Sequence, residues 1–211
     1  LNVISITATG LKFKKEFGQL SDDDFIESLN SINNSAQFLS STIDDFRNFL
    51  KENKAFINVQ VTDLVNKALE LVGSQFTNKD ITIIKNIEDA TIHTLENELI
   101  QVLINILNNS RDALIEKNED KYIFVNTYVN EKELLITIKD SAGGIDENII
   151  DKIFEPYFTT KHQAQGTGIG LYMSEQMITQ HMKGSISVEN TEYDYDSKRY
   201  KGAIFKITLP L

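Results

Sequence analysis

Residues 105–113 read NILNNSRDA, and this stretch decides the fold together with the three motifs that follow it. The others are DSAGGI over residues 140–145, FEPYFTTK over 154–161 and GTGIGL over 166–171. A single glycine-rich string arises by chance in many turns and would be a weak signal. Four motifs in one order are a far more specific signal.

The first motif falls in an expected long helix over residues 96–117, which has one apolar and one polar side. The apolar side carries Leu99, Val102, Leu103 and Ile106. The polar side carries Gln101, Asn105, Asn108, Asn109 and Asp112. A solvated polar stripe is the plain structural explanation, but clustered asparagines cost helix stability because their side chains compete for backbone hydrogen bonds. Amide oxygens suit Mg²⁺ that nucleotide phosphates already hold, so a binding role is favoured.

The second motif follows an expected strand, which places Asp140 at the strand end with two glycines just beyond. A carboxylate there can accept a hydrogen bond from an exocyclic amine, while Gly144 lets the backbone approach a planar ring. Adenine has such an amine. In isolation, an aspartate that caps a turn would be the better interpretation of this motif.

The fourth motif opens an expected helix over residues 169–182, where free N–H groups and the helix dipole favour an anion. It lacks the Gly-Lys-Ser/Thr ending of a Walker loop, and its glycines do not match the dinucleotide-binding spacing. The polar stretch 159–165 before it is expected to form a lid, with Lys161 as a phosphate contact or simply an exposed lysine. The aromatic residues of the third motif are expected mainly to pack.

In their order, these motifs resemble the N box, first glycine box, F box and second glycine box of the ATP-binding domain of sensor histidine kinases. The resemblance implies an α/β two-layer sandwich of the histidine kinase, Hsp90 and gyrase type, with ATP and Mg²⁺ as ligands. It implies that Asn109 is the metal ligand, that Asn105 lies near the phosphates and that Asp140 recognises the adenine amino group. The family usually has Asn where Ser141 stands. The whole expected ATP-binding set is Asn105, Asn109, Asp112, Asp140, Gly144, Ile145, Phe158, Lys161, Gly166, Thr167, Gly168, Ile169, Gly170, Leu171 and Thr208.

One substitution bears on the choice between a kinase and an ATP hydrolase. The gyrase-like, Hsp90-like and MutL-like ATPases carry a Glu one turn before the metal-binding Asn, where it orients the attacking water. Here that position is Asn105. An amide cannot act as a general base, so water attack would not be assisted, and this favours a kinase.

The N-terminal part carries a heptad pattern of apolar residues, which keeps one stripe facing a partner helix. Its positions are Phe25, Leu29, Ile32, Ala36, Leu39, Ile43, Phe46 and Leu50. SDDD over residues 21–24 supplies a helix cap, and an earlier helix with a turn near residues 18–20 completes an antiparallel hairpin. A hairpin that lies on the rest of its own chain is one alternative. We favour two hairpins from two chains in a four-helix bundle.

This hairpin resembles the dimerisation and phosphotransfer domain of sensor kinases. The predicted domains are therefore residues 1–52, an N-terminally truncated hairpin, and 55–211, the catalytic domain. The phosphoaccepting histidine would lie just upstream of Leu1, and this chain by itself would not autophosphorylate. The expected partners are a second copy and a response-regulator receiver domain. The alternative is a pseudokinase-like interaction module that binds nucleotide without phosphotransfer.

Composition narrows the class further. The 211 residues include 21 Lys and Arg against 31 Asp and Glu, and this net charge of −10 argues against a nucleic-acid partner. Cysteine is absent, which excludes disulfides and thiolate metal sites. No apolar run in the sequence is long enough to span a bilayer, so we expect a cytoplasmic chain whose membrane contact, if any, comes through missing N-terminal parts.

The remaining elements predict an α+β class, since strands occur in runs beside helices. The expected strands cover residues 57–61, 81–87, 91–94, 122–129, 133–140, 185–190 and 202–210, and a further helix covers 62–76. Residues 191–201, TEYDYDSKRYK, show no clear periodicity and are expected to be a hairpin loop. The histidines at 93, 162 and 181 are expected to be surface or structural residues.

Overall fold

The computed structural model describes residues 2–49, 55–117, 120–161 and 166–211. Its internal contacts divide the chain into two units. One unit comprises residues 1–52 and 157–168, and the other comprises 53–156 and 169–211.

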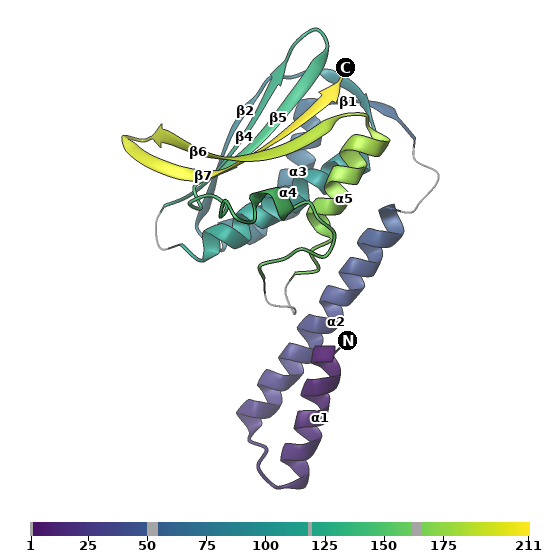
Figure 1. Cartoon of the computed structure of the whole chain (residues 1–211), viewed down its shortest axis with the longest axis vertical. Helices are drawn as coiled ribbons and strands as arrows, with labels where there is room; N and C mark the ends of the chain where they lie inside the picture. The colour runs from purple at the N-terminus through teal and green to yellow at the C-terminus, as the bar shows by residue number, and fades with distance from the viewer. Residues whose placement is uncertain (1, 50–54, 118–119, 162–165) are drawn as a thin grey trace. The chain divides into compact units, whose positions relative to one another are not determined.

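The first unit contains an antiparallel hairpin of α1 (Asn2–Glu16) and α2 (Asp22–Phe49), as Figure 1 shows. Gly18 takes a φ of +65° in the turn between the helices, a conformation that glycine adopts without strain. The Ser21 hydroxyl accepts a 3.1 Å hydrogen bond from the Asp24 amide at the start of α2. This is the expected cap, and the predicted hairpin is confirmed.

The hairpin leaves much of its apolar surface uncovered. In α1 no residue is buried. On α2 the heptad positions Phe25 and Leu29 are 45% and 44% exposed. The later heptad positions Ile43, Phe46 and Leu50 lie outside the described side chains.

The second unit is built on a five-stranded sheet in the order β2-β4-β5-β7-β6. Its strands are β2 (Ile81–Ile87), β4 (Lys121–Val129), β5 (Glu133–Asp140), β6 (Ser185–Tyr195) and β7 (Lys198–Pro210). Only the β2–β4 pair among these is parallel. A second small sheet pairs β1 (Ile57–Gln60) with β3 (Thr91–Thr94).

Three helices cover one face of the large sheet (Figure 1): α3 (Val61–Thr77), α4 (Glu96–Ile115) and α5 (Gly170–Gln176). Alternate strand residues such as Ile123, Ile136 and Ile138 are at most 1% exposed and form the core together with the helices. The predicted apolar side of α4 is buried, since Leu99 and Ile106 are fully covered. The predicted α+β two-layer sandwich is therefore confirmed.

Residues 191–201 differ from the sequence prediction. They are not a loop, because β6 and β7 stay paired as far as Tyr195 and Lys198. Asp196 and Ser197 make the two-residue turn with φ of 47° and 61°, which suits the twist of a hairpin. Tyrosines from both arms contact Tyr122 and Phe124 of β4, and this packing stabilises the extension.

The helix expected over residues 169–182 is also different. It is α-helical to Gln176 and continues as a π-helical turn, Met177–His181. The Met182 amide accordingly donates to the Met177 carbonyl, five residues back, at 3.1 Å. The wider turn places His181 Nδ1 2.9 Å from the buried Glu98 of α4, a structural role as expected. Among the described helices, none combines the length and the apolar character that crossing a bilayer requires.

Candidate nucleotide-binding site

The N-box helix α4 and the start of α5 are in direct contact. Asn105 Nδ2 donates a 2.9 Å hydrogen bond to Ser174 Oγ, and Ser174 in turn donates to the Gly170 carbonyl at 3.0 Å. A Cβ atom on Gly170 would lie 2.5 Å from Asn105 Oδ1, so a larger residue at position 170 would force the Asn105 side chain to shift. The structure therefore brings together Asn105 and Gly170, which the sequence analysis assigned to one site.

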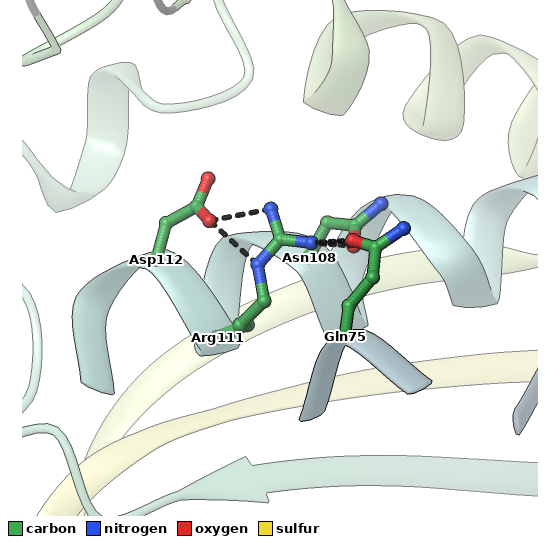
Figure 2. A network of polar contacts seen from close by, with 4 residues as sticks. All are labelled: Gln75, Asn108, Arg111 and Asp112. Atoms are coloured by element: carbon green, nitrogen blue, oxygen red, sulfur yellow. Dashed lines mark hydrogen bonds and ion pairs between the residues drawn. The ribbon is translucent and has the colours of Figure 1, made fainter. Parts of the chain in front are cut away.

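Further along α4, a network built on Arg111 holds the polar side chains in place (Figure 2). Arg111 Nε and Nη2 donate to Asp112 Oδ1 at 2.9 and 2.6 Å. Its Nη1 donates to Asn108 Oδ1 at 2.9 Å and also to the Gln75 amide oxygen on α3. Asp112, a predicted site residue, is thus charge-paired, and Arg111 is a participant that the sequence prediction missed.

Asn109 lies between these two groups on α4. It is one helical turn after Asn105 and is partly buried, so the two share one side of the helix. Ser110, the next residue, is 2% exposed. The helix therefore presents half-buried amides beside a buried hydroxyl rather than a freely solvated stripe.

Asp140 ends β5 and is 3% exposed. Its Oδ1 accepts hydrogen bonds from the Ala142 amide at 2.9 Å and from the Ala203 amide of β7 at 3.1 Å. Burial raises the pKa of this carboxyl above its ordinary value, and the two amides partly oppose the rise. The two amides orient the carboxylate through Oδ1, and the Ser110 hydroxyl is a further polar neighbour.

The turn after Asp140 is held by residues distant in sequence. Gly143 and Gly144 have φ of +92° and +85°. The Gly143 amide donates to the Lys201 carbonyl at 2.9 Å, and the Asn190 side chain makes two 2.7 Å hydrogen bonds with the Ile145 peptide groups. A Cβ on Gly144 would lie 2.5 Å from Asn190 Oδ1. No spacing in the sequence signals the role of Asn190.

The segment 157–168 belongs to the first unit. Here the Tyr157 amide donates to the Gly168 carbonyl at 2.9 Å, and Gly168 has φ +64° with a Cβ position only 2.4 Å from the Tyr157 carbonyl carbon. The F box and the second glycine box thus meet, backbone to backbone. Lys161 donates its amide to Thr159 Oγ1 at 3.1 Å. Residues 162–165 of the expected lid, including His162, lie outside the described residues.

Thr208 is not brought to the Asp140 region. It pairs with Leu135 and Ser185, whereas the Ala203 amide is the β7 group that contacts Asp140. Five residues of strand separate Ala203 from Thr208, which is roughly 16 Å, and an odd separation places side chains on opposite faces. We therefore leave Thr208 out of the proposed site.

The residues present fit a purine nucleotide. An exocyclic amine can donate to Asp140, whose carboxylate is buried and oriented. The Ser110 hydroxyl lies close enough to lower the pKa of Asp140, yet it makes no hydrogen bond of good geometry with the described residues. A buried polar atom in that state suits a ligand or water partner. Asn109 supplies an amide oxygen of the kind that Mg²⁺ accepts beside phosphate oxygens.

Comparison with known proteins gives a consistent result. Residues 94–211 match the family of histidine kinase-, DNA gyrase B- and HSP90-like ATPases. Sporulation kinase E of Bacillus subtilis (strain 168) is 32% identical over 154 residues, which is 72% of this chain and 19% of that protein. The chain spans about a fifth of the length of the first curated relatives it matches.

Solved structures agree with the fold. The nucleotide-free catalytic domain of histidine kinase ThkA superposes with a TM-score of 0.62 at 25% identity, covering 74% of this chain and 95% of that one. Histidine kinase ThkA crystallised with the response regulator protein TrrA superposes with a TM-score of 0.74 at 22% identity, covering 99% of this chain and 57% of that one. The second match includes the helical hairpin as well as the sandwich.

Proposed function

Because the chain belongs to the family of histidine kinase-, DNA gyrase B- and HSP90-like ATPases, we propose that it is the ATP-binding catalytic part of a sensor histidine kinase. Its reaction is transfer of the γ-phosphoryl group of ATP to a histidine, for relay to an aspartate of a response regulator. The observation that carries the proposal is Asp140, a buried carboxylate oriented by two backbone amides at the end of β5. A hydrogen-bond acceptor of this kind selects the amino group of adenine over the carbonyl of guanine.

Each proposed residue has a distinct task. Asp140 accepts the hydrogen bond from the base, and Gly144 keeps the turn free of a side chain that would push the base away. Asn109 holds the Mg²⁺ ion, which when bound neutralises charge on the phosphates. Asn105, through Ser174, keeps the start of α5 against α4.

A phosphotransferase is favoured over a hydrolase by the chemistry of Asn105. Its amide donates to Ser174, so it is part of the packing between two helices. It has no proton-accepting carboxylate that could activate water. The γ-phosphoryl group would therefore remain available for a protein acceptor rather than being lost to solvent.

The proposed partners follow from the hairpin. The hairpin exposes four apolar side chains: Phe25 and Leu29 on α2, and Phe13 and Phe17 near its tip, which are 56% and 69% exposed. We propose that a second copy of the chain covers this apolar surface. The similar kinase ThkA has been crystallised with a response regulator, and we propose a receiver domain as the other partner here.

A nucleotide-binding module without phosphotransfer is the second candidate. Residues 1–52 include no histidine, and this candidate needs no acceptor elsewhere in the protein. Both candidates bind nucleotide, and they differ in whether the whole protein becomes labelled by γ-labelled ATP.

Calorimetry with Mg²⁺-ADP tests nucleotide binding, which both candidate functions require. We expect Asn109→Ala to lower affinity about tenfold or more and to remove most of the dependence on Mg²⁺, because a metal-linked contact is worth roughly 1.5–3 kcal/mol. Asn97→Ala, at an exposed position on the same helix, is the matched control. Equal affinity and equal Mg²⁺ dependence in all three proteins would refute the metal assignment.

Labelling with γ-labelled ATP tests phosphoryl transfer to a histidine, which distinguishes the two candidates. The chain incubated with γ-labelled ATP should stay unlabelled, because phosphoryl transfer needs an acceptor placed in line with the γ-phosphate. The same chain extended upstream to the first histidine should acquire an acid-labile label. Label on His93 or His181 of the present chain would refute the proposed acceptor, and an unlabelled extended chain would favour the second candidate.

A further inference from the structure

We propose that β6 supplies two positioning residues for base recognition, Asn190 and Tyr193, which hold the two ends of the turn 140–145. The inference rests on the proposed function, because it assumes that Asp140 and the glycine turn receive the base. It goes beyond that function by assigning adenine selectivity partly to a strand that carries none of the four motifs.

Asn190 holds the far end of the turn. Its Oδ1 accepts from the Ile145 amide and its Nδ2 donates to the Ile145 carbonyl, both at 2.7 Å. A primary amide that faces backbone groups in this way satisfies one donor and one acceptor at once, and neither a carboxylate nor a hydroxyl can do so with the same geometry. Gly144 permits this close approach, because a Cβ at that position would lie 2.5 Å from Asn190 Oδ1.

Tyr193 holds the near end. Its hydroxyl donates a 2.9 Å hydrogen bond to the Asp140 carbonyl. Its ring is fixed between neighbours, since it stacks on Tyr200 at 5.9 Å and Lys139 Nζ lies 3.5 Å from the ring centroid. Burial raises the pKa of this phenol, so the hydroxyl keeps its proton and remains a donor.

The two contacts matter because the turn cannot hold itself. Gly143 and Gly144 both lie in the left-handed region, where glycine has many alternatives, so the conformation depends on outside contacts. β6 reaches the turn from two sides, since residues three apart on a strand point to opposite faces of the sheet. Fixing both ends fixes where the Asp140 carboxylate points.

Preorganisation of this kind favours adenine over guanine. A carboxylate held in one direction pairs with the adenine amino group and repels the guanine carbonyl, whereas a mobile one can turn away from the repulsion. Loosening either end should therefore lower the affinity for ADP more than the affinity for GDP. A residue that only stabilised the sheet would leave this ratio unchanged.

The test compares Asn190→Asp and Tyr193→Phe with two matched controls. Asn190→Asp keeps the shape but places a second oxygen against the Ile145 carbonyl. Tyr193→Phe keeps the ring in the aromatic cluster and removes one hydrogen bond. Asn86→Asp makes the same charge change on an exposed position of β2, and Tyr195→Phe removes a hydroxyl two residues along the same face of β6.

Calorimetry should show ADP affinity lowered about tenfold or more in Asn190→Asp and about two- to tenfold in Tyr193→Phe, with the ADP-to-GDP affinity ratio falling by a similar factor. Both controls should stay within about twofold of the parent, which is below the loss of one hydrogen bond. Hydrogen exchange of the amides of residues 143–145, without nucleotide, should be faster in the two test variants. Thermal unfolding shows that each variant is folded at the temperature of measurement.

Folded variants with the parent's affinity ratio and the parent's amide protection would overturn the positioning role while leaving the proposed function intact. A parent chain that binds no ADP would overturn the proposed function and this inference together. If Asn190→Asp does not fold, Tyr193→Phe alone decides, since an unchanged ratio in that variant contradicts the inference.

Discussion

Replacing Asp140 by asparagine should separate binding from stability. The variant has the same shape, and an amide oxygen can still accept from the Ala142 and Ala203 amides that hold Oδ1. The amide nitrogen then takes the place of Oδ2, so a donor faces the donor of the adenine amino group. Loss of a charge-assisted hydrogen bond costs about 1.5–3 kcal/mol, which is roughly ten- to a hundredfold in ADP affinity.

Stability should change in the opposite direction. Burial raises the folded-state pKa of Asp140 above the ordinary 3.8. A raised pKa means that the stability contributed by this group is present below the unfolded-state value and is lost as pH rises through the folded-state value. Each pKa unit of this rise corresponds to about 1.4 kcal/mol of stability lost at neutral pH. The neutral asparagine avoids this loss because it carries no charge.

Chemical unfolding without nucleotide, from about pH 4 to about pH 8, measures this effect. The free energy of unfolding of Asp140→Asn minus that of the parent should increase with pH and be positive at neutral pH. Calorimetry on the same samples gives ADP affinity. A variant that is less stable than the parent at neutral pH, or that binds ADP with the parent's affinity, would refute the reasoning.

Three further predictions test the packing of the site and the hairpin. Gly170→Ala should lower ADP affinity in calorimetry, because its Cβ would lie 2.5 Å from an amide oxygen of α4. Gly73→Ala, with open space around it in α3, should instead raise the free energy of unfolding by about 0.5–1 kcal/mol. If Gly170→Ala raised the free energy of unfolding in the same way and kept the parent's ADP affinity, the close approach at Gly170 would be contradicted. Arg111→Lys should lower the free energy of unfolding by about 1–2 kcal/mol in urea titrations, since an ammonium cannot replace the forked contacts in Figure 2, and an unchanged value would count against the network. Phe25→Asp with Leu29→Asp should yield a monomer in sedimentation, because both side chains are exposed in the hairpin, and a monomeric parent would refute the dimer.

The elements that the sequence predicted are those in which local pattern and packing agree. The apolar side of α4 was predictable because Leu99 and Ile106 recur at helical spacing, and both are fully buried. The cap at Ser21 and the glycine turn before it were predictable because each depends on a few neighbouring residues. Asp140 could be placed at a strand end for the same reason.

The missed features depend on contacts between residues far apart in the chain. Asn190 contacts Ile145, and Arg111 contacts Gln75 on another helix. Tyr193 alternates with acidic residues of low strand propensity, and the aromatic partner that keeps its strand extended, Phe124, comes from β4. No spacing rule along the chain connects such pairs, because tertiary packing rather than sequence order makes them neighbours.

The same structural coupling explains why the N-box amide and the second glycine box belong together. Asn105 fits against Gly170 with no space for a Cβ between them, and it donates to Ser174 one turn further along α5. A glutamate at position 105, the residue expected in gyrase-like, Hsp90-like and MutL-like ATPases, would be longer by one methylene and could not donate that hydrogen bond. Under the proposed function, an amide at this position lacks the basicity to activate water and also supplies a contact between the helices. The chemistry of Asn105 and the packing of Gly170 would then constrain one another.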